Sequence, residues 1–153
     1  MTLLALGTVA LGAGSASAAG HLVPFSASFS GIAIETSPTS GVLDGSGNAT
    51  HMGSTTNDGQ VNAFFDQPRT GCFNGFRSTN DETFTAANGD TLMIHSEDAA
   101  CPQGPGQFQG TGHWVVTGGT GRFSDAAGEG SYKGFVDFSA GTFDVSFTGG
   151  ISY

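Results

Sequence analysis

The fold is decided by residues 143–153, which read FDVSFTGGISY. The odd positions carry Phe, Val, Phe, Gly, Ile and Tyr, while the even positions carry Asp, Ser, Thr, Gly and Ser. This period of two is typical of a β-strand that buries one face and presents the other to water. The stretch therefore predicts a β-strand at the end of the chain.

The same alternation recurs along the preceding sequence. Further strand patterns are found at residues 23–33, 42–52, 61–65, 82–87, 90–95, 108–116 and 128–138. Asn88 and Gly89 separate two of these patterns, and both tolerate the positive φ of a type I′ turn. We therefore predict a β-hairpin with a two-residue turn at this position.

Other connections are less regular. Asn57-Asp58-Gly59 has the composition of a turn, and the alternation weakens over residues 66–80. The sequence does not decide which side of the strand at residues 128–138 is buried, because the apolar residues Phe135 and Val136 are adjacent and would point to opposite sides. A β-bulge in this strand would place both on the same face.

Composition favours strands over helices. Of 153 residues, 26 are glycine, and each interior glycine costs a helix about 1 kcal/mol relative to alanine. We predict an all-β fold, with residues 19–153 forming a single antiparallel barrel of about eight strands. Closure of the barrel would leave no exposed strand edge. A two-sheet β-sandwich is the alternative.

The first 18 residues differ from the rest of the chain. They carry no charge, run apolar over residues 3–13, and end in Ala16-Ser17-Ala18. We interpret residues 1–18 as a secretory signal peptide that is truncated at its N-terminal side. The apolar run is shorter than the ~20 residues of a membrane span. We therefore expect a secreted protein, extracellular or in the cell envelope, without a membrane span.

Cys72 and Cys101 are the two cysteines of the chain. An even number of cysteines in an exported protein predicts a disulfide bond. This bond would connect the irregular segment before the predicted hairpin to the segment after it.

The charge of the chain excludes some partners. The formal net charge is −9, with four Lys and Arg against 13 Asp and Glu, so nucleic acid is not an expected partner. We interpret the pairs Asp81-Glu82 and Glu97-Asp98 as solvated loop residues, with calcium binding as the alternative if the two loops met. No triad, metal-ligand or nucleotide-binding pattern is complete, so we predict no catalytic residue set, no metal and no cofactor.

Several glycine-rich stretches resemble those of known proteins. GGTGRF at residues 118–123, followed by AAGEG at 126–130, resembles turns in small barrels related to plant allene oxide cyclase and dirigent proteins. GNATHMG at 47–53 and TAANGD at 85–90 resemble exported bacterial proteins without known activity. The resemblance implies an eight-stranded antiparallel barrel with an apolar mouth, often oligomeric, so a homo-oligomer is an open expectation. The pocket carboxylates and arginines of those families have no matching motif here.

Two hypotheses about function follow. The first is a non-catalytic binding or structural module for a small apolar ligand, with Phe108, Trp114 and Tyr132 lining the barrel. The alternative is an isomerase or cyclase of the allene oxide cyclase-like type, in which Glu129 or Tyr132 moves a proton. An open pocket would support binding, a buried carboxylate facing it would favour the enzyme, and a filled interior would leave a structural role.

Overall fold

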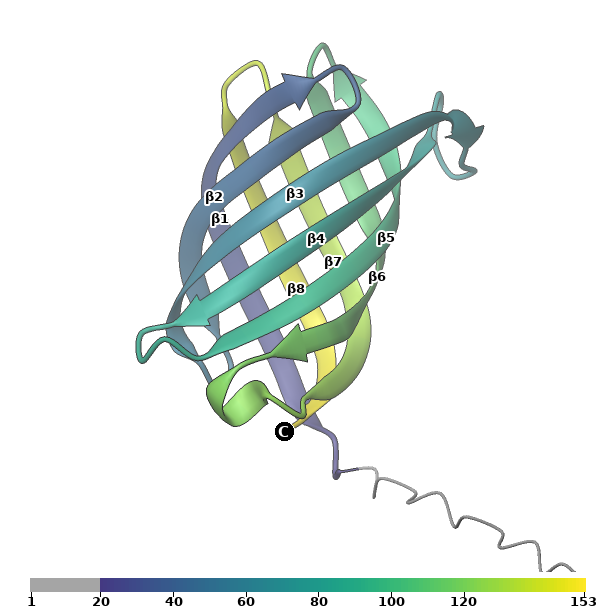
Figure 1. Ribbon diagram of the computed structural model, residues 1–153. Coiled ribbons are helices and arrows are strands. Elements are labelled where there is room, and N and C mark those ends of the chain that lie inside the picture. The colour runs from purple at the N-terminus through teal and green to yellow at the C-terminus, as the bar shows by residue number, and fades with distance from the viewer. Residues whose placement is uncertain (1–19) are drawn as a thin grey trace, which may run out of the picture.

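The computed structural model describes residues 20–153, so the predicted signal peptide lies outside the described residues. Eight antiparallel strands form one closed barrel in which each strand pairs with its neighbours in sequence, and the last pairs with the first (Figure 1). The strands are β1 (Val23–Ser37), β2 (Ser40–Ala49), β3 (Gly53–Pro68), β4 (Phe76–Ala86), β5 (Thr91–Gly104), β6 (Gln107–Gly119), β7 (Ala127–Asp137) and β8 (Thr142–Ser152). A short 3₁₀ helix, η1 (Gly121–Phe123), connects β6 to β7. The predicted all-β barrel is confirmed, and the sandwich alternative is wrong because the sheet closes.

Alternate side chains of each strand point into the barrel interior and out to the surface. On β1, Phe25 and Phe29 are buried while the serines between them are exposed. Phe29 contacts Phe84 of β4 at a ring distance of 4.6 Å, and Phe84 contacts Phe147 of β8 at 5.3 Å. These phenylalanines come from strands on different sides of the barrel, so they fill its interior rather than one face of a sheet.

Trp114 of β6 is buried because two glycines make room for its indole ring. Its Nε1 donates hydrogen bonds to the carbonyl oxygens of Ser131 and Thr148, at 3.1 and 3.2 Å. A Cβ atom placed on Gly149 would lie 2.7 Å from Trp114 Cζ2, and one on Gly130 would lie 2.7 Å from Trp114 Nε1. Glycine at these inward positions therefore allows a large aromatic side chain inside a narrow barrel.

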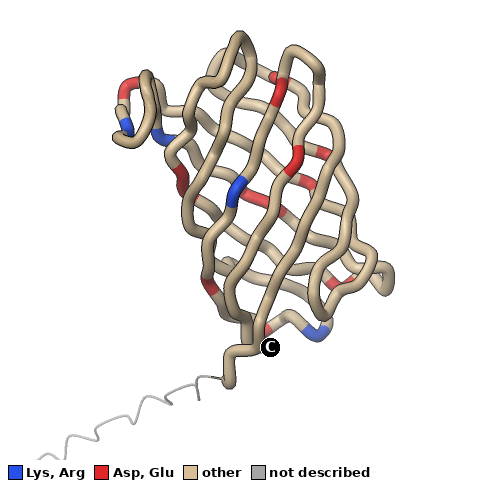
Figure 2. The backbone as a smooth tube through the Cα atoms, turned by 180° about the vertical axis from the view of Figure 1, so that it is seen from behind, with Lys and Arg blue, Asp and Glu red and all other residues tan. Residues whose placement is uncertain are grey.

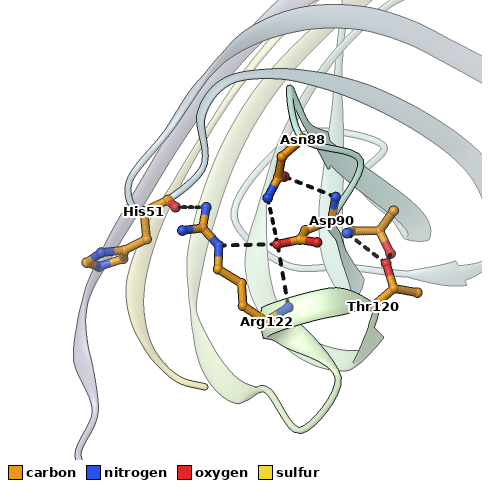
Figure 3. Close-up of polar contacts among 6 residues, drawn as sticks. His51, Asn88, Asp90, Thr120 and Arg122 are labelled. Carbon is orange, nitrogen blue, oxygen red and sulfur yellow. Dashed lines mark hydrogen bonds and ion pairs between the residues drawn. The ribbon is translucent and has the colours of Figure 1, made fainter.

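One end of the barrel is covered by η1 and the turns beside it, at the lower end in Figure 1. Phe123 is fully buried there. The Arg122 guanidinium donates to the carbonyl oxygen of His51, and its Nε lies 3.6 Å from Asp90 Oδ2 (Figure 3). Asn88 Nδ2 also donates to Asp90 Oδ2, at 2.9 Å. Arg122 thus links the β2–β3 turn to the β4–β5 turn, and the glycine-rich stretch at 118–123 forms an end cap.

The β4–β5 hairpin exists, but its turn differs from the predicted one. Gly89 has a φ of +88°, whereas Asn88 does not have a positive φ. The Gly89 N–H donates to the carbonyl of Ala86, and the Ala86 N–H donates to the carbonyl of Asp90. This is a three-residue loop in which a turn is followed by a left-handed glycine, so the type I′ prediction is wrong.

Two further predictions are also corrected, one of a turn and one of a β-bulge. Asn57-Asp58-Gly59 lies inside β3, where Asn57 pairs with Gly45 of β2 and with Phe84 of β4. The strong ladder on both sides outweighs the turn propensity of the three residues. β7 pairs regularly with both neighbours and has no bulge. Its inward face is the one that carries Tyr132, so Phe135 lies on the outer face.

The predicted disulfide bond is confirmed. Cys72 and Cys101 are bonded with a Cα–Cα distance of 5.9 Å, and the bond ties the β3–β4 connection to β5. Phe73, beside Cys72, is 87% exposed.

Charged residues are spread over the strands and connections (Figure 2). Glu97 on the outer face of β5 forms ion pairs with Arg69 and Arg77, at 3.0 and 2.9 Å. Hydrogen bonding from Arg77 is the main reason that the pKa of Glu97 falls to about 2. Among residues 20–153, no helix is long and apolar enough to cross a membrane.

Candidate functional site

A cavity of about 260 Å³ opens at the barrel end opposite η1. This end carries the β1–β2, β3–β4, β5–β6 and β7–β8 connections, at the upper end in Figure 1. Six phenylalanines are among the residues that line it: Phe65, Phe76, Phe108, Phe135, Phe138 and Phe143. Aliphatic side chains complete the wall, among them Leu43, Val61, Ala63, Val136 and Val145.

The phenylalanines contact one another around the mouth. The ring centre of Phe76 lies 4.5 Å from that of Phe65 and 5.6 Å from that of Phe108. Phe108 lies 6.4 Å from Phe138. Phe65 is half exposed, so the mouth presents an apolar aromatic rim to the solvent.

Polar side chains form the inner end of the cavity. Ser78 and Asn80 come from β4, Asp98 from β5 and Tyr132 from β7. The Tyr132 hydroxyl donates to Asp98 Oδ2, and the Ser78 hydroxyl donates to Asp98 Oδ1. Asn80 Nδ2 donates to the Tyr132 oxygen at 2.8 Å. Both oxygens of Asp98 therefore have hydrogen-bond donors.

Burial shifts the ionisation of this network. Burial raises the pKa of Asp98, opposed by the hydrogen bonds from Ser78 and Tyr132. Burial and the charge of Asp98 raise the pKa of Tyr132 above its ordinary value. Tyr132 therefore keeps its proton at neutral pH and acts as a donor to the carboxylate.

Glu82 of β4 is the second buried carboxyl group that lines the cavity; the other acidic lining residues, Glu35 and Asp144, are exposed. Its side chain is 3% exposed, and Oε2 accepts a hydrogen bond from Asn57 Nδ2 at 2.8 Å. Burial raises the pKa of Glu82 from 4.5 to about 7, and the bond from Asn57 opposes the shift. Asn57 itself is fully buried, and its Oδ1 has no hydrogen-bond partner.

Strand periodicity places these carboxyl groups inside the barrel. On β4, Ser78, Asn80 and Glu82 lie in phase with the buried Phe76 and Phe84. On β5, Asp98 lies in phase with the buried Leu92 and Ile94, and it pairs with Ser78 across the sheet. Two neighbouring strands thus direct carboxyl groups to the same interior.

The interpretation of Asp81-Glu82 and Glu97-Asp98 as loop residues is therefore wrong. Both pairs lie within strands, so one carboxylate of each pair points inward and the other outward. The signal in the sequence is the spacing of Glu82 and Phe84: residues two positions apart in a strand point to the same face, so Glu82 shares the buried face of Phe84. Within residues 20–153, no cluster of three or more His, Cys, Asp or Glu side chains has the arrangement of a metal site.

The predicted site residues divide between the cavity and the packed core. Phe108 and Tyr132 line the cavity. Trp114 is not among its lining residues and lies buried against Phe25, with a ring distance of 5.5 Å. Glu129, the predicted proton carrier of the enzyme hypothesis, is exposed. The buried carboxyl groups that line the cavity are instead Glu82 and Asp98.

The fold and the cavity together define an eight-stranded up-and-down β-barrel with an aromatic mouth and an acidic inner end. Comparison of the chain with protein-family models, with curated proteins and with solved structures found no match.

Proposed function

We propose that the protein is an exported, non-catalytic binding module that holds a small, largely apolar molecule in the mouth of its barrel. The observation that carries this proposal is the cavity of about 260 Å³ with phenylalanine walls and a polar inner end. Ligand sites typically combine an apolar lining with a few fixed polar groups. The resemblance to barrels with an apolar mouth gives further support.

The size of the cavity limits the ligand. Pockets for drug-sized molecules begin at about 300 Å³, so this cavity suits a molecule of roughly the size of one aromatic ring with a short side chain. Burial of ~150 Å² of apolar ligand surface, at ~25 cal/mol per Å², contributes about 4 kcal/mol. This value alone corresponds to a dissociation constant of about 1 mM. The cost of immobilising the ligand weakens binding and hydrogen bonds to the polar inner end strengthen it, so we expect dissociation constants in the millimolar range.

A cavity-filling variant tests the proposal. Ala63→Phe adds a phenyl ring inside the cavity, whereas Gln60→Phe adds the same ring at an exposed position of the same strand. We expect calorimetry to detect 2-phenylethanol binding to the wild type and to Gln60→Phe, but not to Ala63→Phe. Equal binding by all three proteins would place the ligand elsewhere and contradict the proposal. If only Ala63→Phe loses binding, native mass spectrometry of protein from its natural source would identify the physiological ligand.

A second function is favoured by the two buried carboxyl groups that line the cavity. A buried carboxyl with a pKa near 7, as at Glu82, can both accept and donate a proton at neutral pH. An isomerase or cyclase acting on an apolar substrate would use such a group. Once the ligand is known, its incubation with protein in deuterated water tests this function. Deuterium at a carbon atom of the ligand, lost in Glu82→Gln, is the expected result, and its absence would leave the binding function alone.

A further inference from the structure

The inner end of the cavity accepts hydrogen bonds but has few donors left to give. The side-chain donors of Ser78 and Tyr132 are bound to Asp98, and that of Asn80 is bound to Tyr132. Asn57 Nδ2 is bound to Glu82. Apart from the proton that Glu82 itself can carry, a ligand that fills this cavity must therefore bring its own donors.

An unused acceptor is found at the same place. The structure gives Glu82 Oε1 no hydrogen-bond donor within the described residues, although the side chain is almost completely buried and lines the cavity. Asn57 Oδ1 also has no partner within residues 20–153, but it is buried behind Glu82 and Asn57 does not line the cavity. A buried acceptor without a donor is unfavourable by about 1–3 kcal/mol, so a ligand that supplies a donor here would be favoured.

Among residues 20–153, no basic side chain lines the cavity to balance its carboxyl groups. Arg69 and Arg77 pair with Glu97 on the outside, and Arg122 lies at the opposite end of the barrel. Lys133 is exposed on β7. The lining residues include four acidic residues, Glu35, Glu82, Asp98 and Asp144, and no Lys or Arg. A carboxylate or phosphate ligand would therefore be repelled, and a positive charge would be attracted.

The aromatic wall suits the same kind of ligand. Phenyl rings at 4.5–6.4 Å from one another surround the entrance. Such rings bury an apolar body, and their faces also attract a cation within about 6 Å. The cavity therefore combines an apolar compartment with an acceptor-rich, acidic end.

We propose that the ligand is a small organic amine, bound as an ammonium ion that donates to Glu82 while its apolar body lies among the phenylalanines. This inference rests on the proposed function, because it names the chemical class that the same cavity would take. An ammonium group supplies up to three donors and one positive charge, which are the two properties that the inner end of the cavity lacks.

Proton release should accompany amine binding. The groups near Glu82 are Asn57 of β3, Tyr132 of β7, and Asn80 and Asp98 farther along the cavity. Of these, Asn57 and Asn80 do not titrate, Tyr132 stays protonated, and the charge of Asp98 would add to the attraction. An ammonium ion favours the ionised form of Glu82, so binding near neutral pH would displace its proton.

The test compares four probes of similar shape by calorimetry: 2-phenylethylamine, 2-phenylethanol, ethylbenzene and phenylacetate. We expect the amine to bind the wild type at least tenfold more tightly than the alcohol, a difference of about 1.4 kcal/mol, and phenylacetate to bind most weakly. Glu82→Gln should remove the preference for the amine and retain alcohol binding. Asp58→Asn, which removes an exposed carboxylate from β3, is the matched control and should behave like the wild type.

The outcomes separate this inference from the proposed function. If the alcohol or ethylbenzene binds as tightly as the amine, and Ala63→Phe abolishes that binding, the amine inference is overturned while the cavity remains a binding site. If no probe binds, or if Ala63→Phe has no effect, both proposals fail. A second measurement does not depend on the folding of Glu82→Gln: calorimetry of the wild type at pH 6.5, in two buffers of different ionisation enthalpy. Proton release with the amine but not with the alcohol supports the inference, and equal release with both overturns it.

Discussion

Replacement of Glu82 by glutamine should change how the stability of the protein depends on pH. Burial raises the pKa of Glu82 from 4.5 to about 7, so the folded protein holds this proton more tightly than the unfolded chain does. Between these two pH values the folded state carries more bound protons, and stability therefore falls as the pH rises. Glutamine has nearly the same shape but no titrating proton, so Glu82→Gln lacks this dependence.

The magnitude follows from the two pKa values. At about 1.4 kcal/mol per pH unit, the difference between 4.5 and about 7 corresponds to about 3 kcal/mol of unfolding free energy. The contribution of Glu82 is most favourable below pH 4.5 and is lost by the time the pH has passed 7. Asp98 and Glu97 also have shifted pKa values, but they are present in both proteins and largely cancel from the difference.

Urea denaturation followed by circular dichroism at pH values from 4 to 8 measures this effect. We expect the stability of Glu82→Gln relative to the wild type to rise by about 3 kcal/mol from pH 4 to pH 8. Asp58→Asn, at an exposed position of β3, should follow the wild type. Parallel stability curves for the wild type and Glu82→Gln would refute the conclusion that Glu82 is buried with a raised pKa.

Three other predictions concern the barrel itself. Replacement of both Cys72 and Cys101 by serine should lower the unfolding free energy by about 3.6 kcal/mol for a 29-residue separation; an unchanged urea midpoint would contradict this. Phe84→Ala should cost about 3–5 kcal/mol because the side chain is fully buried, whereas Phe73→Ala should lie within about 0.5 kcal/mol of the wild type. Comparable losses in the two variants would argue against the assigned core. Gly149→Ala should cost about 1–3 kcal/mol by crowding the backbone of Glu129 and Gly130 and the indole ring of Trp114, and it should shift the tryptophan fluorescence; an unaltered spectrum and midpoint would show that the barrel has spare room there.

Much of the fold could be predicted from the sequence because the strands alternate so regularly. The Phe-Ser pattern of β1 and the Phe-Asp-Val-Ser pattern of β8 each fixed which face is buried, and the pairing of these two strands closes the barrel. The disulfide bond followed from the presence of two cysteines in a chain with a predicted export signal. These features are local or countable, and they do not require knowledge of which strands meet.

The candidate site was harder to predict because it depends on exceptions to the alternation. Glu82 and Asp98 are polar residues at inward positions, and beside a second acidic residue each looked like part of a solvated loop. Trp114 was placed in the cavity because large aromatic side chains often line ligand sites, but inward strand positions extend through the whole length of the barrel. The end cap around Phe123 determines which half of the interior is packed and which half is open. This arrangement cannot be derived from the periodicity of the sequence.

A crystal structure with bound 2-(4-bromophenyl)ethylamine would test the central claim most directly, because the anomalous signal of bromine locates the ligand without ambiguity. We expect a bromine peak among Phe65, Phe76 and Phe108, with the ammonium nitrogen within hydrogen-bond distance of Glu82. A bromine peak on the outer surface, or an interior filled by the phenylalanine side chains themselves, would contradict it.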